Sequence, residues 1–166
     1  PEQNQLDLSF LTIGPEIALT RLWNRGAVTA TASYNNLGPY MKLVPQNYEW
    51  KHAPESASGA VSIRQKSGKS GLLKIYSSYD NGSFSLVQED LDQNKNIDYN
   101  LHNSNFFVNT SYRNKLGQKW TSTTSASFTS DKDDVAFEET NFNKELSGFH
   151  LKEVISDEVS SKITLK

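Results

Sequence analysis

Apolar and polar residues alternate along most of this chain with a period of two. The clearest example is residues 105–113, where Phe106, Val108, Thr110 and Tyr112 fall on one face and mostly Asn, Ser and Arg fall on the other. Such alternation is typical of a half-buried β-strand. We therefore predict a strand over this segment.

A second strand is predicted over residues 119–129, with an aromatic residue near each end of its apolar face. Trp120 and Phe128 are these two residues, and Thr and Ser fill the opposite face. At about 3.3 Å per residue the two aromatics lie ~26 Å apart along the strand. A tilt of ~40° reduces this to ~20 Å of height, close to the ~25 Å apolar band between the aromatic girdles of outer-membrane barrels. The spacing favours a membrane-spanning strand, and packing on a soluble core is the alternative.

The same alternation gives an all-β fold, an antiparallel up-and-down meander of about eight strands that forms part of a transmembrane β-barrel. Gly14 and Pro15 mark either a bend in one long strand or a turn between two short ones. We interpret them as a bend. The predicted strands are then residues 6–22, 26–34, 60–66, 72–79, 105–113, 119–129, 148–155 and 159–166.

The connections alternate between short and long. Short polar turns are predicted at residues 23–26, 67–71, 114–118 and 156–158. Long loops are predicted at residues 35–58, 80–104 and 130–146. Short turns on one rim and long loops on the other are typical of transmembrane barrels. We therefore interpret residues 1–166 as a single segment of barrel wall.

Three runs of the sequence resemble the TonB-dependent receptors of Bacteroidetes-type bacteria. They are NLGPYMKLVPQNYEWKHAPES (36–56), GAVSIRQKSGKSGLLKIYSSYDNGSFSL (59–86) and NSNFFVNTSYRNKLGQKWTSTTSASFTSDKDD (103–134). The resemblance covers roughly residues 10–135. It implies a bacterial outer-membrane location, contact with outer-membrane lipid, and import of a scarce nutrient that the sequence does not identify.

The resemblance also implies energy from the TonB system and a plug domain inside the barrel. No segment of this chain is assigned to the plug or to a TonB box, so these functions would belong to other parts of the receptor. We expect the chain to be a piece of a larger protein. An isolated piece of wall has two open edge strands, and we expect it to pair edge to edge with a second copy.

Charge and composition exclude several other classes of protein. Seventeen Lys and Arg residues are interspersed with nineteen Asp and Glu residues, for a net charge of −2, so there is no basic stripe for nucleic acid. The chain has no cysteine and hence no disulfide or thiolate site. No stretch approaches the roughly 20 apolar residues that a membrane-spanning helix needs.

One polar segment partly matches a calcium-binding loop. Lys95 stands where glycine should allow the sharp turn, and Leu101 stands where a glutamate should close the coordination sphere. A solvated loop therefore explains the segment better, and we expect no metal. The candidate calcium ligands are Asp90, Asp92, Asn94 and Asp98.

No catalytic site is predicted. His52, His102 and His150 fall in different segments without paired spacing, so neither a metal triad nor a general base with its orienting carboxylate is indicated. No serine sits in a nucleophile elbow. We expect a protein that is not an enzyme and needs no cofactor.

Aromatic residues on a proline-rich loop are the candidate ligand-binding residues: Tyr40, Tyr48 and Trp50. They could bind a sugar or another flat ligand, although packing of the loop against the barrel explains them as well. Two other functions remain open, a soluble lipocalin-like barrel that binds a small ligand and a β-rich adhesion module. The Ser, Thr, Asn, Lys and Arg of the more polar strand face favour the receptor, because a soluble barrel needs an apolar interior.

Overall fold

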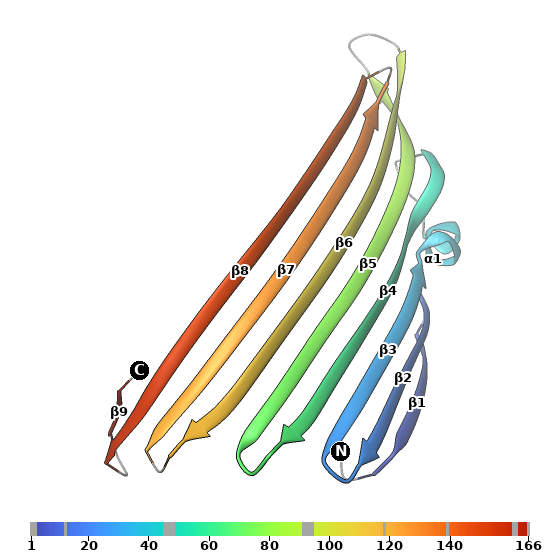
Figure 1. Ribbon diagram of the computed structural model, residues 1–166. Helices are drawn as coiled ribbons and strands as arrows, with labels where there is room; N and C mark the ends of the chain where they lie inside the picture. Colours follow the sequence, from blue (N-terminus) through green and yellow to red (C-terminus); the bar gives the residue numbers. More distant parts are fainter. Residues whose placement is uncertain are drawn as a thin grey trace.

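Over the residues that it describes, the computed structural model is one antiparallel sheet of nine strands in sequential order, with one short helix (Figure 1). It describes residues 3–11, 13–44, 49–90, 95–117, 119–138, 140–160 and 163–165. The predicted all-β, antiparallel up-and-down meander is confirmed, and the sheet is open rather than closed into a barrel. The elements are β1 (Gln5–Leu11), β2 (Gly14–Trp23), β3 (Gly26–Asn36), α1 (Gly38–Leu43), β4 (Glu49–Ser67), β5 (Gly71–Asp90), β6 (Lys95–Leu116), β7 (Trp120–Phe137), β8 (Thr140–Ser160) and β9 (Ile163–Leu165).

The predicted bend at Gly14 and Pro15 is wrong. The chain reverses there, and β1 and β2 form a hairpin in which Leu11 pairs with Gly14. A β-carbon at Gly14 would lie 1.8 Å from the carbonyl oxygen of Tyr34 in β3. The turn therefore approaches β3 so closely that only glycine fits.

The predicted extents of the long loops are also wrong. Strands β5 to β8 run for 18 to 22 residues each, and they occupy most of residues 80–104 and 130–146. Residues 35–58 hold the end of β3, helix α1 and the start of β4, and the turn predicted at 156–158 lies inside β8. Apolar alternation stops just past residues 79 and 106 because both faces are polar there, as at Asp80 and Asn81 on β5 and at Ser104 and Asn105 on β6. The backbone ladder nevertheless continues, as in the pairing of Asp80 with Asn105.

The strand register assigns each strand residue to one of two faces, because successive side chains point to opposite sides. One row of partners crosses the sheet from β3 to β8: Val28, Ile63, Ile75, Thr110, Ala126 and Leu151. We call the face with this row the belt face. We call the other the polar face, and its neighbouring row is Thr29, Ser62, Tyr76, Asn109 and Ser127.

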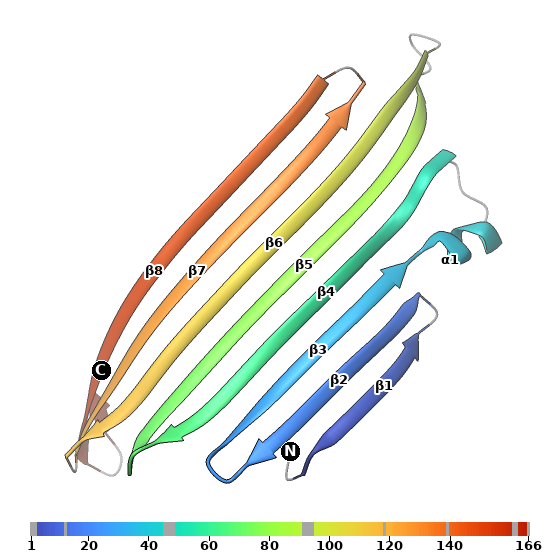
Figure 2. The ribbon, with the colours of Figure 1, turned by 45° about the vertical axis from the view of Figure 1, so that its right-hand side comes forward.

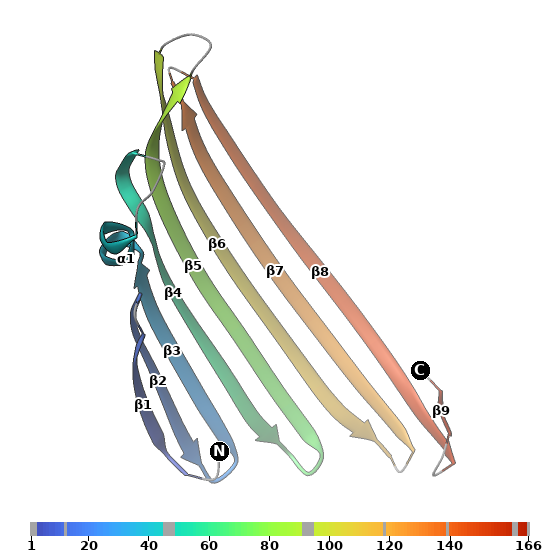
Figure 3. The same cartoon turned by 180° about the vertical axis from the view of Figure 1, so that it is seen from behind.

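In the described part of the chain the sheet forms a single curved layer, with no second layer packed on it (Figures 2 and 3). Within the described ranges no hydrophobic residue is buried, and large side chains such as Phe10 and Phe149 are 84% and 71% exposed. Soluble domains bury one face of a sheet against another layer. In this sheet, no other layer of the described chain covers either face.

The two ends of the sheet differ. Hairpins β2–β3, β4–β5 and β6–β7 turn at one end, drawn at the bottom of Figure 1, which we call the short-turn end. The opposite end, which we call the far end, carries helix α1 and the extended parts of β4 to β8. These two ends are the reference for the surfaces described next.

Candidate functional site

The belt face carries a band of exposed and half-buried apolar side chains that begins at the short-turn end and is interrupted by Arg21 and by the hydrogen-bonded group of Ser122, Thr124 and Glu153. We call it the apolar belt. The three N-terminal strands and the central strands all contribute leucine, isoleucine or valine. Its aliphatic members include Leu6, Leu8, Ile17, Leu19, Val28, Val61, Ile63, Leu73, Ile75, Val108, Leu151 and Ile155.

A row of aromatic side chains closes the apolar belt on the side of the far end. Its members are Tyr34 on β3, Tyr79 on β5, Phe106 on β6, Phe128 on β7 and Phe149 on β8. The register pairs Tyr79 with Phe106 and Phe128 with Phe149, and the ring centroids of Phe106 and Phe128 are 6.4 Å apart. The sequence alone had indicated only Phe128 as a boundary of this kind.

The distance from the short turns to the aromatic row is similar from strand to strand. Tyr34 follows the first residue of β3 by eight positions, Phe128 follows Trp120 by eight, and Phe106 precedes the last residue of β6 by ten. These intervals correspond to about 26–33 Å along a strand. The apolar belt therefore has nearly constant width.

Beyond the aromatic row the belt face becomes polar. The Tyr34 hydroxyl donates a 2.7 Å hydrogen bond to Glu55, and His52 lies 2.9 Å from the other oxygen of this carboxylate. These two hydrogen bonds, first that of Tyr34, hold the pKa of Glu55 below its usual value. Other belt-face residues past the row are Asn36, Asn81, Ser104, Ser130, Lys132 and Glu145.

The polar face is held by hydrogen bonds between side chains on neighbouring strands. Thr20 bonds Thr29 at 3.1 Å, and Ser33 bonds Ser58 at 2.7 Å. Farther along, Asn103 donates to Asp133 and Asn105 donates to Asp131. From the short-turn end to the middle of the long strands this face is therefore mainly hydrophilic, apart from the neighbouring rings of Tyr76 and Phe107, and it carries anionic groups about midway along the long strands.

At the far end, the polar face carries a small aromatic cluster. Trp50 meets Phe84 edge to face with centroids 6.0 Å apart, and Phe84 lies 5.6 Å from Tyr99. Of the three aromatics that the sequence suggested for ligand binding, only Trp50 belongs to this cluster. Tyr40 lies on α1 and is 47% exposed, and Tyr48 lies outside the described residues. The sequence missed Phe84 and Tyr99 because they come from the segment predicted as a loop.

Of the candidate calcium ligands, only Asp98 has a side chain within the described part of the structure. Lys95 to Leu101, which would form the second half of the loop, belong to β6, and Asp90 pairs with Lys95 across the hairpin. Both carboxylate oxygens of Asp98 lie 2.7 Å from the Lys51 ammonium. Asp92 and Asn94 lie outside the described residues. Among the residues that the structure describes, no group of three His, Asp or Glu side chains could hold a metal ion.

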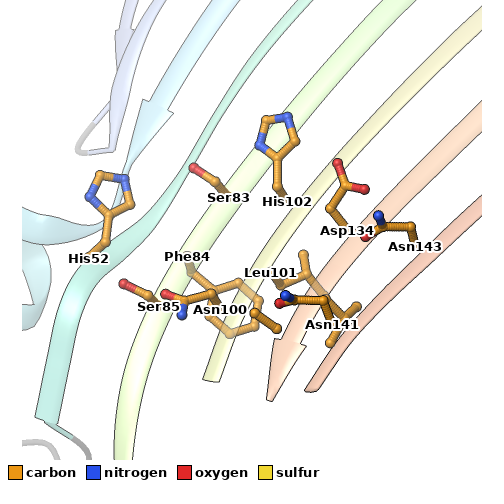
Figure 4. Close-up of a pocket in the computed structure, with 12 residues that line it drawn as sticks. His52, Ser83, Phe84, Ser85, Asn100, Leu101, His102, Asp134, Asn141 and Asn143 are labelled. Carbon is orange, nitrogen blue, oxygen red and sulfur yellow. The ribbon is translucent and has the colours of Figure 1, made fainter. Parts of the chain in front are cut away.

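A shallow hollow of about 330 Å³ lies on the belt face past the aromatic row (Figure 4). It is lined by His52, His102, Asp134 and Asn143 among others, so the fold brings two of the three scattered histidines to one place. His52 is engaged by Glu55, and a ring nitrogen of His102 lies 3.2 Å from the Asn81 amide. His52 therefore has an acidic neighbour and His102 has a neutral one. Such polar contacts are compatible with a hydrated surface.

No family model, no curated protein and no solved structure matches this chain. Across the described ranges no helix is long and apolar enough to cross a membrane. The chemistry of the two faces of the sheet is therefore the main indication of function.

Proposed function

We propose that this chain is part of the wall of a transmembrane β-barrel in a bacterial outer membrane. The apolar belt, closed by the aromatic row, is the observation that carries the proposal. With strands tilted ~40°, its width of 26–33 Å along a strand corresponds to about 20–25 Å of height, as in the lipid-facing band of such barrels. Tyr34 and Tyr79 are suited to the membrane–water boundary. A tyrosine side chain can place its apolar ring toward the lipid and keep its hydroxyl group in water.

The energetics support a lipid environment. Monomeric soluble proteins rarely expose contiguous apolar patches beyond a few hundred Å². Each Å² of apolar surface removed from water is worth about 25 cal/mol, so a belt across eight strands would be costly to leave hydrated. Long paired strands satisfy backbone N–H and C=O groups within the sheet, which is the condition for crossing hydrocarbon.

The polar face would then line the barrel interior, and the far end would project outside the cell. A transporter of the TonB-dependent receptor kind, which the sequence resembles, would use this interior to import a nutrient. The plug and the contact with the TonB system would come from parts of the receptor other than this segment. In the complete barrel the open edges at β1 and β9 would pair with neighbouring strands, and an isolated segment would pair with a second copy.

The proposal predicts opposite surroundings for two adjacent residues of β6. Val108 lies in the apolar belt and Asn109 on the polar face. Since the chain has no native cysteine, Val108→Cys and Asn109→Cys can each carry a single nitroxide label. In outer membranes, the label at 108 is expected to collide mainly with dissolved oxygen and the label at 109 mainly with a water-soluble nickel chelate.

The same measurement separates the barrel wall from a soluble ligand-binding barrel. In a lipocalin-like protein the apolar residues point inward, so the label at 108 would be shielded from both reagents and the label at 109 exposed to water outside. A shielded 108 label in a protein recovered from the soluble fraction would overturn the outer-membrane proposal.

A further inference from the structure

The shallow hollow on the belt face is lined by hydroxyl, amide and imidazole groups from strands β4 to β8 (Figure 4). His52 of β4 pairs with Ser85 of β5 at its edge. Ser85 is only 8% exposed, the least of the described residues on this face. The register brings the other belt-face residues of the hollow together in two adjacent rows, one of Ser83, His102, Asp134 and Asn143 and one of Ser85, Asn100, Ala136 and Asn141.

Several of these polar groups have hydrogen-bonding capacity that the described part of the protein does not use. The side chains of Ser85, Asn100 and Asn143 form no hydrogen bond with another described residue. A primary amide has two N–H donors and a carbonyl acceptor, and a hydroxyl both donates and accepts. Buried polar groups such as the Ser85 hydroxyl are normally paired. The hollow is therefore suited to a ligand that donates and accepts several hydrogen bonds.

The charges at the hollow indicate that this ligand is neutral where it binds. Among the described residues no lysine or arginine lines the hollow. His52 lies 2.9 Å from Glu55, and Asp134 lies 3.6 Å from the ammonium of Lys132. A phosphate or carboxylate would need unpaired arginine or lysine side chains. Sugar hydroxyls match the amides and hydroxyls without any added charge.

The height of the hollow above the apolar belt limits the kind of lipid that can reach it. Along the strands, its residues follow the aromatic row by four to eight positions, as Ser83 follows Tyr79 and Asn141 precedes Phe149. This interval is about 13–26 Å along a strand, or about 10–20 Å of height at a tilt of ~40°. A phospholipid headgroup layer is only about 5–8 Å thick. A headgroup made of several sugar units would extend far enough.

We propose that the hollow binds the saccharide headgroup of a glycolipid in the outer leaflet of the membrane. The proposal rests on the proposed function, because only there does the belt face look outward, into lipid. On that face the hollow is reached from the membrane and not from the barrel interior. Its ligand is thus a neighbour of the barrel and not the transported solute.

Anchoring in the membrane also explains how so shallow a site can be filled. A free saccharide would lose its translational freedom on binding to an open hollow. A glycolipid whose acyl chains already lie against the apolar belt is held close to the hollow, so its headgroup is present at a high effective concentration. Contacts at the apolar belt and in the hollow therefore act together on one molecule.

Native mass spectrometry of the whole protein, purified from outer membranes, tests this inference by counting bound lipids during a titration. The three probes are lipid A that carries its inner-core sugars, lipid A without those sugars, and the free inner-core oligosaccharide. We expect the sugar-bearing lipid A to bind at least tenfold more tightly than either of the other two probes.

A double variant assigns the binding to the hollow. Asn100→Ala/Asn143→Ala is expected to weaken binding of the sugar-bearing lipid A about 25-fold, since each lost hydrogen bond is worth a factor of about five. Binding of lipid A without the sugars should not change. Asn109→Ala, on the opposite face of β6, is the matched control and should leave both affinities unchanged. Folding of each variant is checked by its recovery in the outer membrane.

Two outcomes would overturn the inference. In one, both forms of lipid A bind equally and the double variant has no effect, which means that the hollow does not contact the sugars. In the other, the free oligosaccharide binds as tightly as the sugar-bearing lipid A, which indicates a site for a soluble saccharide. Either outcome with the predicted labels at Val108 and Asn109 refutes the glycolipid site alone, whereas a label at 108 shielded from lipid refutes the barrel itself.

Discussion

Ala126→Arg is expected to remove most of the folded protein from the outer membrane. Ala126 lies inside the apolar belt, six positions from Trp120 and two from Phe128, and it pairs with Thr110 on β6 and Leu151 on β8. An arginine on the lipid face costs about 2–4 kcal/mol at the bilayer midplane and about 0–1 kcal/mol at the boundary, so a cost of about 1–3 kcal/mol is expected at residue 126. A cost of that size lowers the equilibrium ratio of folded to unfolded protein by about 5- to 150-fold. The measurement is the amount of protein that keeps the mobility of a folded barrel on unheated gels of outer membranes.

Ser127→Arg is the matched control for this variant. Ser127 is the next residue of β7, is equally half-buried, and faces the polar side opposite Asn109 and His150. An arginine there would point into a hydrated interior, so near-normal recovery is expected. Equal loss for both variants would mean that the two faces do not differ in their surroundings. A harmless Ala126→Arg would argue against lipid contact altogether.

The sequence predicted the strands wherever apolar and polar residues alternate, and it failed where they do not. Residues 105–113 have a clear period of two because this part of β6 crosses the apolar belt. Farther along the same hairpin, both Asn81 on the belt face and Asn105 on the polar face are hydrophilic. A strand that leaves the apolar belt loses its periodic signal although its backbone ladder continues, so the extension looked like a loop.

The apolar belt and the aromatic row depend on the register between neighbouring strands, and a single sequence does not give this register. Trp120 and Phe128 belong to one strand, so their spacing was visible in the sequence. Tyr34 on β3 and Phe149 on β8 join the same aromatic row only after the five strand pairings between them have been fixed, across more than a hundred residues of chain.

Gly14→Ala is expected to open the β1–β2 hairpin without unfolding the rest of the sheet. The new methyl group would lie 1.8 Å from the Tyr34 carbonyl oxygen and 2.8 Å from its carbonyl carbon, and both atoms are backbone. Overpacking of this kind costs about 1–3 kcal/mol. The edge hairpin can yield by moving away from β3, whereas β4 to β8 are held by partners on both sides. Amide hydrogen exchange in β1 and β2 should therefore quicken by about 5- to 150-fold, the change in the opening equilibrium for that cost.

Gly148→Ala separates this effect from the mere loss of a glycine. A β-carbon at Gly148 would lie 3.6 Å from the Thr129 methyl group, an ordinary van der Waals contact. Alanine also restricts the unfolded chain more than glycine does, so exchange near residue 148 should be unchanged or slower. If Gly14→Ala left exchange in β1 and β2 unchanged, the close approach of residue 14 to Tyr34 would be refuted, because a backbone atom at that distance cannot make room for a methyl group without moving the turn.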